Sequence, residues 1–543
     1  MRFFNTAGPV NCDDHYCLPP LERFDLAEIE MLLAQKKYFV LHAPRQTGKT
    51  TSMLALVDHL NAGKNYRALY CNVETAQTAR EDVAKGMQNI LVELGERASN
   101  DLKDEFLSEN GSKMLFEYGE HAALKMALTR FCQASDLPVV LVLDEIDALV
   151  GDTLISVLRQ IRSGYPQRPG QFPTSIVLCG VRDVRDYRIH SGTGKEIITG
   201  GSAFNIKAKS LRMGDFVKKE VDLLLQQHTH ETGQAFTPDA VSCIWHLSQG
   251  QPWLVNALAY EACFEMKDGR DRTRPIDKAM VDQAKENLIL RRETHLDQLG
   301  DKLRESRVQR VIEGVLSGRA EVAGNLPEDD IQYVTDLGLI RRKPQVAIAN
   351  PIYREIIPRM LTASTQDTLS HQTAWYITPD HRLDMDKLMK AFQEFFQEHS
   401  AHWLERFQYK EAGPQLLLQA FLQRIINSGG RIEREYGLGR QRVDLLVLWP
   451  LETEEAAVQA GRAAWTRWQG PVQKVVVELK VLHKSLEQTI AKGLDQTRTY
   501  MDTCGTTDGH LVIFNRDPDI SWEDKIFHRT EICRGIPVQI WGM

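Results

Sequence analysis

The chain has 543 residues, and because domains usually hold about 100 to 200 residues, about three or four of them are expected. Hydrophobic residues make up 43% and charged residues 26% of the chain, as in an ordinary globular protein. No apolar run reaches the ~18 residues that cross a membrane, which argues against a membrane role. The net charge of −7 does not indicate a nucleic-acid-binding protein, although such a sum can hide a local basic surface.

The N-terminal residues and the cysteines favour the cytoplasm. Residues 1–16 lack the apolar core and the cleavage site of a signal peptide. The nine cysteines are scattered without a paired CxxC, so buried thiols are expected rather than a disulfide framework or a zinc site. Cys12, His15 and Cys17 lie close together, but a second pair of metal ligands is missing.

A phosphate-binding loop is predicted near the N-terminus. Residues 37–42, "KYFVLH", have the pattern of a strand, and the turn "APRQTGKT" leads into "TSMLALVDHL", whose apolar positions have helical spacing. This is the context of a Walker A loop, in which backbone amides hold phosphates at a helix N-terminus. Lys49 is expected to reach the outer phosphates and Thr50 to bind magnesium, although Ala43 replaces the first glycine of the motif. The expected nucleotide contacts are Pro44, Arg45, Gln46, Thr47, Gly48, Lys49, Thr50 and Thr51.

A Walker B strand is predicted at residues 137–150, "LPVVLVLDEIDALV". Its continuous apolar run is typical of a parallel strand buried on both faces, and it ends in Asp144 and Glu145. We expect Asp144 to hold the magnesium ion through water and Glu145 to polarise the water that attacks the γ-phosphate. With strands at 67–73 and 174–183, this predicts an α/β doubly wound sheet with its ligands at the carboxyl ends of the strands.

Three arginines follow the strand at 174–183. They are Arg182, Arg185 and Arg188. One of them is expected to sense the γ-phosphate, with Arg182 favoured, and the alternative is that all three belong to a solvated basic loop.

Six stretches of the first half resemble one group of ATPases. They are "HYCLPPLERF", "YFVLHAPRQTGKTT", "VLVLDEIDAL", "SIVLCGVRDVRDY", "SAFNIKAKSLRMGDF" and "SQGQPWLVNALAYE". Over residues 10–290 they look like the AAA-like ATPases of the broad STAND and archaeal-ATPase group, which implies ATP and magnesium as cofactors. In that group a GxP element of the helical lid lies near the nucleotide, which nominates Pro252. A helix start with proline in its first turn is a compatible alternative.

The domain boundaries follow from changes in pattern. Residues 1–208 are expected to form the ATPase domain, and helical periodicity over 209–290 predicts the lid. In 291–365, two short apolar runs flank the turn "RRKPQ", which suggests a winged helix. Its basic residues Arg341, Arg342 and Lys343 are too few to decide between DNA contact and a structural role. Residues 366–399 are expected to form a linker and a helical entry.

Two acids interrupt apolar strands in the C-terminal region. Asp444 lies within "RIEREYGLGRQRVDLLVLW", and the strand "VVVELKVLHK" places Glu478 and Lys480 two positions apart, hence on one face. Because burial of an unpaired carboxylate is costly, both acids are expected to converge on magnesium or manganese, with Lys480 orienting water or stabilising phosphate charge. The alternative is a surface salt bridge along an edge strand.

The order D…ExK resembles the core of the PD-(D/E)xK nucleases, and the resemblance covers about residues 400–543. In "GLDQTRTYMD", Gln496 and Tyr500 match the QxxxY element of the RecB-type members, and Glu411 stands where that superfamily has an acid before its core strands. The resemblance implies a mixed-sheet, restriction-endonuclease-like α/β domain. Its metal would lie at the two acids of the D…ExK core, Asp444 and Glu478. Residues 451–470 are expected to be an insertion with its own helix.

Together these features predict an ATP-dependent or ATP-regulated, metal-dependent nuclease that acts on DNA. A role in defence against foreign DNA or in the control of mobile elements is an expectation from the resemblance. The alternative is a STAND-like ATPase switch, able to form a homo-oligomer, whose C-terminal fold serves binding rather than cleavage. A third possibility is a motor that translocates DNA.

Overall fold

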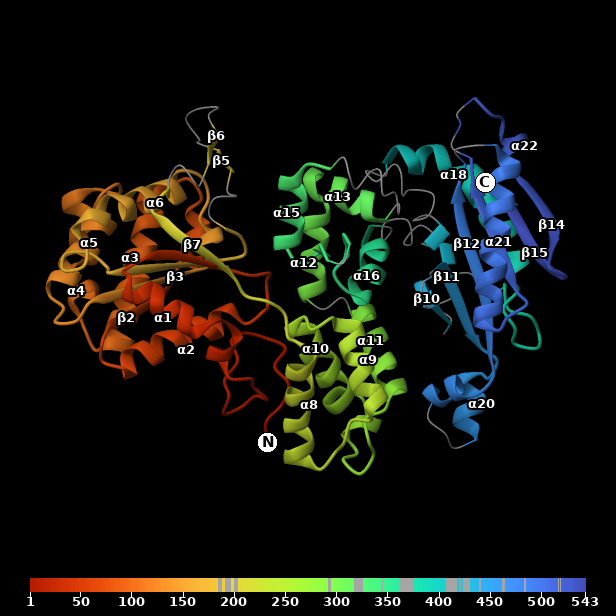
Figure 1. The fold of residues 1–543 in the computed structure, drawn as a ribbon, viewed down its shortest axis with the longest axis horizontal. Coiled ribbons are helices and arrows are strands. Elements are labelled where there is room, and N and C mark those ends of the chain that lie inside the picture. The colour runs from red at the N-terminus through yellow and green to blue at the C-terminus, as the bar shows by residue number, and fades with distance from the viewer. Residues whose placement is uncertain are drawn as a thin grey trace. The chain divides into compact units, whose positions relative to one another are not determined.

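A computed structural model gives the fold of the chain (Figure 1). The chain divides into two compact units. The first unit comprises residues 1–284 and 328–349, and the second comprises residues 285–327 and 350–543. The structure describes residues 1–183, 188–190, 197–199, 204–291, 294–316, 326–343, 345–361, 375–406, 418–419, 421–422, 430–438, 441–460, 464–482, 485–515, 517 and 519–543.

The first unit contains a five-stranded sheet in which every pairing is parallel. Its strand order is β2-β3-β4-β1-β7, so the chain crosses over between non-adjacent strands, as in doubly wound folds. The predicted parallel α/β sheet is therefore confirmed. The strands are β1 (Tyr38–His42), β2 (Arg67–Asn72), β3 (Val139–Asp144), β4 (Ser175–Gly180) and β7 (Lys207–Arg212).

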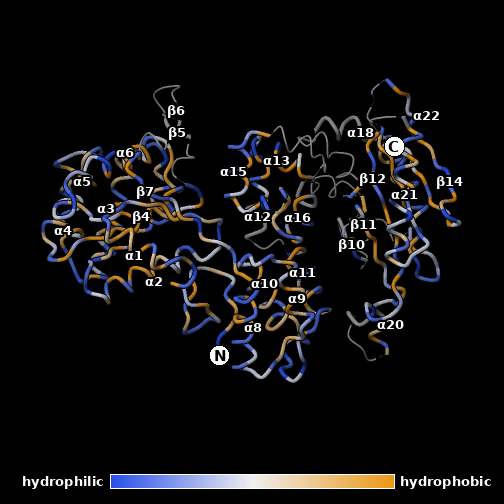
Figure 2. Tube along the Cα trace, viewed as in Figure 1, coloured by the Kyte–Doolittle hydropathy of each residue, from blue (hydrophilic) through white to orange (hydrophobic). Residues whose placement is uncertain are grey.

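Helices cover both faces of this sheet. Successive residues of a strand point to opposite faces, so Val140 and Val142 join one core while Leu141 and Leu143 join the other. Figure 2 shows the resulting apolar colour along the central strands. The first core is covered by α1 (Leu26–Ala34) and α2 (Lys49–Ala62). The second is covered by α3 (Val83–Leu102), α4 (Phe106–Tyr118), α5 (Ala123–Gln133) and α6 (Gly151–Gly164).

A helical region follows the sheet where the sequence predicts a lid. Side-chain caps start two of its helices: Thr237 Oγ1 accepts from Ala240 N, and Gln251 Oε1 accepts from Leu254 N. The N-terminal segment packs here too, because the ring of Phe4 lies 5.7 Å from that of His228. The helices are α8 (Lys218–Thr232), α9 (Pro238–Ser248), α10 (Pro252–Tyr260) and α11 (Lys278–Arg291).

The predicted winged-helix region, 291–365, is divided between the two units. The two short apolar runs around the "RRKPQ" turn form an antiparallel pair, β8 (Ile340–Arg341) and β9 (Ala347–Ile348). With α15 (Glu328–Asp336) they belong to the first unit. The helices that belong to the second unit are α12 (Thr294–Leu303), α13 (Ser306–Leu316) and α16 (Pro351–Leu361).

The second unit contains a separate six-stranded sheet in the order β10-β11-β12-β13-β15-β14. It is mixed, because β12 with β13 and β13 with β15 are parallel while the other pairs are antiparallel. The strands are β10 (Arg431–Leu438), β11 (Gln441–Pro450), β12 (Val472–Val481), β13 (Gly509–Phe514), β14 (Phe527–Cys533) and β15 (Ile536–Gly542). A mixed C-terminal sheet is thus confirmed, and its likeness to a nuclease fold stays a proposal.

Helices cover both faces of this sheet too. Leu511 and Ile513 of β13 pack in the core under α21 (Leu486–Cys504). On the other face, the ring of Phe514 contacts that of Phe396 of α18 (Met385–Arg406), at 5.6 Å between centroids. The expected helix within 451–470 is present as α20 (Glu454–Gln459), and α22 (Trp522–Lys525) precedes β14.

One sequence expectation about cysteines is wrong. Cys12 and Cys17 form a disulfide, with their Cα atoms 5.2 Å apart. A turn brings them together, since His15 N donates to Asn11 O at 2.8 Å. The other seven cysteines are thiols, and six of them are buried. Over the described ranges, none of the helices has the length and apolar character needed to cross a membrane.

Candidate nucleotide and nuclease sites

The loop between β1 and α2 has the backbone of a phosphate-binding turn. Gly48 has φ 90°, a left-handed conformation that strains any residue with a side chain, and α2 begins at the next residue. Thr47 Oγ1 donates to Pro44 O at 2.8 Å and closes the turn. Backbone amides at a helix start and in such a turn are suited to binding anions. This conformation explains why glycine stands at position 48.

Lys49 lies where the sequence predicts a phosphate contact. Its side chain is buried, and Nζ donates to Ala43 O and Pro44 O, each at 3.0 Å. These bonds hold the ammonium group across the loop that precedes it. A phosphate oxygen in the loop would compete with these two carbonyls for the same three donors.

Asp144 and Thr50, both predicted to serve magnesium, are in contact. Thr50 Oγ1 donates to Asp144 Oδ2 at 2.8 Å, and Tyr70 OH donates to the same oxygen at 2.9 Å. Burial, followed by the charge of Asp144, raises the pKa of Tyr70 well above its usual range, so the phenol stays a neutral donor. A hydroxyl and a carboxylate are hard oxygen ligands of the kind that Mg²⁺ prefers, so the pair fits that ion. No sequence pattern predicts Tyr70 at this position.

Glu145 has the electrostatics of a group that exchanges protons near neutral pH. Burial, with the negative charge of Asp147 next, raises its pKa to about 7, while Lys49 acts in the opposite direction. Its backbone lies in the left-handed region, at φ 56°, and its N–H donates to Asp144 Oδ1 at 2.9 Å. Asp147 Oδ1 accepts from Val181 N at 2.8 Å, which ties the ends of β3 and β4 together.

Arg182, the favoured sensor, stacks on an aromatic ring. Its guanidinium lies over Tyr333 of α15, 4.7 Å from the ring centroid. The same segment of the first unit reaches the phosphate loop, because a Cβ on Gly338 would lie 2.8 Å from Pro44 Cβ. Arg185 and the side chain of Arg188 lie outside the described residues.

Two of the three basic residues of the predicted wing have partners within the first unit. Arg341 Nη1 donates to Gln249 Oε1 at 3.1 Å, and Arg342 donates to Gln332 Oε1 at 3.0 Å. Arg342 also pairs with Glu328. These contacts favour a structural role for both guanidinium groups.

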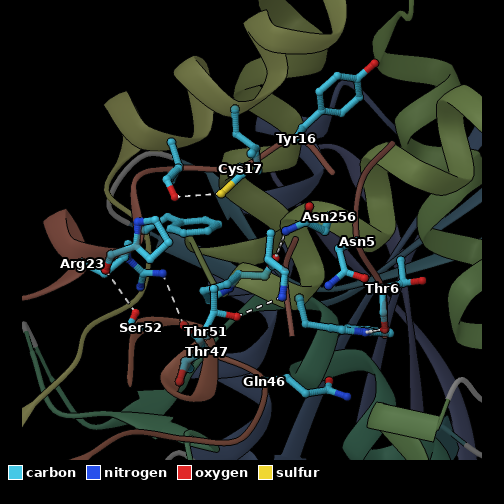
Figure 3. Close-up of a pocket in the computed structure, with 18 of the residues that line it drawn as sticks. Asn5, Thr6, Tyr16, Cys17, Arg23, Gln46, Thr47, Thr51, Ser52 and Asn256 are labelled. Atoms are coloured by element: carbon cyan, nitrogen blue, oxygen red, sulfur yellow. Dashed lines mark hydrogen bonds between the residues drawn. The ribbon is translucent and has the colours of Figure 1, made fainter. Parts of the chain in front are cut away.

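A pocket adjoins the phosphate loop (Figure 3). Its wall includes Pro252, which the resemblance nominated, at the first turn of α10. Two hydrogen bonds fix the N-terminal segment over it: Val10 N donates to Thr51 Oγ1 at 3.0 Å, and Trp253 Nε1 donates to Thr6 O at 2.8 Å. The phosphate-loop and α2 residues in the lining are Gln46, Thr47, Gly48, Thr51 and Ser52, and the N-terminal ones are Asn5, Thr6, Ala7, Gly8, Val10, Tyr16, Cys17, Leu18, Pro20 and Arg23.

Arg23 connects this loop to the start of the helical region. Nη1 donates to Thr47 O at 3.3 Å and Nη2 donates to Gly214 O at 2.6 Å. The guanidinium also lies over the ring of Phe216, at 4.5 Å from its centroid. The sequence stretch "HYCLPPLERF" contains this arginine, but spacing alone did not single it out.

In the second unit, Asp444 and Glu478 lie on neighbouring strands. The antiparallel register pairs Leu445 with Val477, so the next pair along is Asp444 opposite Glu478, and cross-strand partners share a face. Asp444 Oδ2 accepts from Leu479 N at 2.8 Å. The structure therefore brings together the two acids that the sequence assigned to one metal.

Glu478 is a buried acid with one free oxygen. Its exposure is 2%, and its Oε1 accepts from Lys480 Nζ. Its Oε2 has no hydrogen-bond partner within the described part of the chain. Burial, with the charge of Asp444 next, raises its pKa to about 7. The alternative reading is right that Glu478 pairs with Lys480. It is wrong about the place, because β12 lies between β11 and β13 and is not an edge strand, and Glu478 is buried.

The remaining predicted nuclease residues are on α21 or outside the description. Gln496 Oε1 is buried and, of the groups that the structure places, none is its hydrogen-bond partner. Tyr500 packs in the core under α21. Glu411 lies outside the described residues. The described residues contain no cluster of three or more His, Cys, Asp or Glu side chains that could hold a metal. The candidate metal ligands are therefore the carboxylates of Asp444 and Glu478, including the unpartnered Oε2 of Glu478.

The loop, Lys49 and the Thr50–Asp144 contact define a P-loop nucleotide-binding domain. Residues 33–187 match the sequence profile of the AAA domain family. This part of the chain is therefore an AAA-type ATPase domain, which implies ATP and, as a rule, magnesium. The match covers less than one third of the chain and does not reach the second unit.

Solved structures give weaker likenesses. The Walker-type ATPase of Pyrococcus abyssi is 14% identical over 65% of this chain and 99% of that one, with a TM-score of 0.45. Cdc6p of Pyrobaculum aerophilum is 13% identical over 65% and 95%, with a TM-score of 0.36. The RuvB Holliday junction branch migration motor of Thermotoga maritima is 13% identical over 62% and 96%, with a TM-score of 0.32. All three scores are below 0.5. Comparison with curated proteins gave no match.

Proposed function

We propose that this chain is an ATP-regulated, metal-dependent nuclease that cleaves DNA, with the AAA-type domain controlling a phosphodiesterase site at Asp444 and Glu478. One observation carries the proposal: a buried carboxylate, Glu478, has an unpartnered oxygen and faces a second carboxylate across the strand pair. Lys480 supplies one positive charge to this pair of acids, and the second negative charge favours a proton or a further cation beside the buried carboxylate. A divalent cation would leave both acids ionised.

On the ATPase side, each residue has a separate task. Lys49 would bind the outer phosphates, and Thr50 and Asp144 would hold a magnesium ion, which neutralises phosphate charge when bound. Glu145, with its pKa near 7, would accept a proton from the attacking water. Arg182 would reach the γ-phosphate after leaving Tyr333.

On the nuclease side, Asp444 and Glu478 would hold magnesium or manganese, which stabilises charge on the scissile phosphate and acidifies water when bound. Lys480 lies beside Glu478 and would orient the water or neutralise the phosphate. Gln496 and Tyr500 would position the strand or the ligands, and Glu411 would assist from its place before the core strands in the sequence. The preference for DNA, and a role in defence or in control of mobile elements, rest on the resemblance to PD-(D/E)xK domains.

Plasmid cleavage tests this proposal directly. The full chain is incubated with supercoiled plasmid, Mg²⁺ or Mn²⁺, and ATP, beside the Glu478→Gln and Lys49→Ala variants. A matched control is Glu531→Gln, which neutralises an exposed acid on β14 of the same sheet. We expect cleavage by the wild type and by the control, none by Glu478→Gln, and reduced cleavage by Lys49→Ala.

Two outcomes would overturn it. Cleavage that persists in Glu478→Gln removes the assigned nuclease site. Cleavage that is indifferent both to ATP and to Lys49→Ala removes the regulation by the ATPase domain.

A second candidate is a STAND-like switch, in which the C-terminal sheet binds rather than cleaves. The contact of Tyr333 with Arg182 favours it, because a segment beyond the helical region occupies the predicted sensor. The switch predicts a nucleotide-dependent change of oligomeric state with no plasmid cleavage. Light scattering of the full chain with ADP and with ATP distinguishes the two candidates.

A further inference from the structure

The strand β14 forms one edge of the C-terminal sheet (Figure 1). Among the described strands, β15 is its only neighbour, and the two pair in one unbroken antiparallel register over all seven residues of β14. Proteins usually block such an edge with proline, lysine or a bulge. The sequence of β14, "FHRTEIC", contains neither proline nor lysine, and its register has no bulge. A regular edge of this kind is suited to pairing with a further strand.

The hairpin geometry determines which backbone groups of β14 point away from β15. The two strands are joined by the two-residue turn 534–535, whose φ angles of 48° and 79° are those of a type I′ turn. In such a hairpin the flanking residues, Cys533 and Ile536, form a hydrogen-bonded pair, and bonded and non-bonded pairs alternate from there. Pro537 fits this alternation, because it has no N–H and lies opposite Ile532, in a non-bonded pair. The residues whose N–H and C=O groups point outward are therefore His528, Thr530 and Ile532.

The side chains of β14 are self-complementary in one register. When two copies of the strand pair antiparallel about Thr530, Arg529 of each copy lies opposite Glu531 of the other, which gives two pairs of opposite charge. These are non-hydrogen-bonded pairs, in which side chains approach most closely. Moving the centre by one residue would place Arg529 opposite Arg529, or Glu531 opposite Glu531, and like charges directly opposite each other destabilise a strand pair. The charges therefore select the register centred on Thr530.

The same register covers an apolar side chain that faces water in the single chain. Ile532 is 76% exposed. Pairing about Thr530 places it opposite His528 of the second copy, on the same face of the sheet. The imidazole of His528 is stacked on the ring of Trp541, with the centroids 3.8 Å apart, so Ile532 would pack against an ordered ring. Burial of this side chain adds a hydrophobic contribution to the backbone hydrogen bonds.

We propose that β14 is a dimerisation edge, where it pairs antiparallel with β14 of a second copy of this chain about Thr530 and joins the two six-stranded sheets into one. This inference goes beyond the proposed function and is independent of it. The contact uses neither the Walker motifs nor the two acids of the candidate metal site, so it forms equally with and without nucleotide. Neutralisation in Glu531→Gln keeps a side-chain oxygen opposite Arg529, and the dimer persists in that variant.

Sedimentation equilibrium of the full chain, over about a hundredfold range of concentration, tests this pairing. We expect a monomer–dimer equilibrium in the wild type. Thr530→Pro removes an outward N–H but none of the bonds to β15, and it should abolish the dimer. Arg529→Glu places acids opposite acids and should weaken the dimer about tenfold or more, whereas Arg529→Glu with Glu531→Arg exchanges the charges and should restore it. The control Lys492→Glu makes the same change of net charge at an exposed position of α21 and should associate as the wild type does.

Thermal melts establish that each variant is folded, and the charge exchange needs no proline. Wild type that stays monomeric at every concentration overturns the inference. A dimer that persists unchanged in both Thr530→Pro and Arg529→Glu uses another surface and overturns it as well. A charge exchange that melts as the wild type does but stays monomeric removes the register about Thr530. Plasmid cleavage decides the nuclease separately, since an uncut plasmid beside an intact dimer removes the nuclease alone.

Discussion

The guanidinium of Arg182 lies over the ring of Tyr333, 4.7 Å from its centroid, and so the favoured γ-phosphate sensor is engaged by α15. A cation–π contact of this kind contributes about 0.5 to 2 kcal/mol. If Arg182 must leave the ring to reach a phosphate, that contact opposes hydrolysis. The relationship therefore predicts that the ring restrains ATP turnover.

Replacement of the ring tests this restraint. We expect Tyr333→Ala to raise the rate of ATP turnover by about 2- to 30-fold, the factor that corresponds to the lost contact. Tyr333→Phe keeps a ring and should leave the rate near that of the wild type, while Arg182→Ala should lower it. A steady-state phosphate-release assay gives the rates, and thermal melts check the folding of each variant. Equal rates for Tyr333→Ala and Tyr333→Phe would contradict the restraint.

Glu145 predicts the pH dependence of hydrolysis. Burial and Asp147 raise its pKa to about 7, and only the deprotonated carboxylate accepts a proton from water. The kcat/KM for ATP, which reports the pKa of the nucleotide-free chain, should therefore rise with pH through about 7 and level off above it. Glu145→Gln should slow hydrolysis by about 10²- to 10⁴-fold and still bind ATP. A pH profile that stays flat from pH 6 to 8 in the wild type would rule out this role.

The nucleotide motifs are predictable because each is contiguous and has its own local geometry. The run ending at Asp144 specifies a buried strand, and glycine at position 48 marks a left-handed turn. Tyr70 is different. It reaches Asp144 only because β2 lies beside β3, a pairing that depends on the order of the whole sheet.

The candidate metal site at Asp444 and Glu478 was likewise predictable only in part, because the local pattern shows the acids but not the register of their strands. An acid in each of two apolar strands was visible in the sequence, and both acids proved to share a face. Their direct opposition depends on the antiparallel register of β11 and β12, which a long insertion obscures. The Cys12–Cys17 disulfide was missed because the turn at Asn11 leaves no mark in the cysteine spacing.

Glu478 predicts how pH and metal affect stability. Its pKa is raised from 4.5 to about 7, so the folded chain binds a proton that the unfolded chain has released. Its contribution to the free energy of unfolding is therefore undiminished below about pH 4.5 and falls as pH rises to about 7, by up to about 3 kcal/mol. Above pH 7, Mg²⁺ or Mn²⁺ should restore stability by replacing the proton.

Urea denaturation with EDTA or with Mn²⁺, at several pH values, measures this effect. Glu478→Gln removes the titrating group and should show neither the loss at higher pH nor the gain from metal. The control Glu531→Gln should behave as the wild type does. Wild type that gains no stability from Mn²⁺ at pH 8 would count against a metal at this site.

Arg23 predicts that nucleotide affinity depends on a residue outside the Walker motifs. It donates to Thr47 O in the phosphate loop and to Gly214 O, and it stacks on Phe216 in the pocket wall. Loss of these contacts leaves the loop less ordered before phosphate binds, so we expect Arg23→Ala to weaken ADP binding by about tenfold.

Two further variants distinguish the effect of the planar guanidinium group of Arg23 from the effect of its positive charge. Arg23→Lys keeps the charge, but its ammonium lacks the planar fork that spans two carbonyls and a ring, so an intermediate loss of ADP affinity is expected. Arg130→Ala removes an exposed arginine of α5 and should leave ADP affinity unchanged. Calorimetric titration of ADP provides the three affinities. If Arg23→Lys binds ADP as tightly as the wild type, charge alone suffices, and the ordering of the loop through Thr47 O is not what supports the nucleotide.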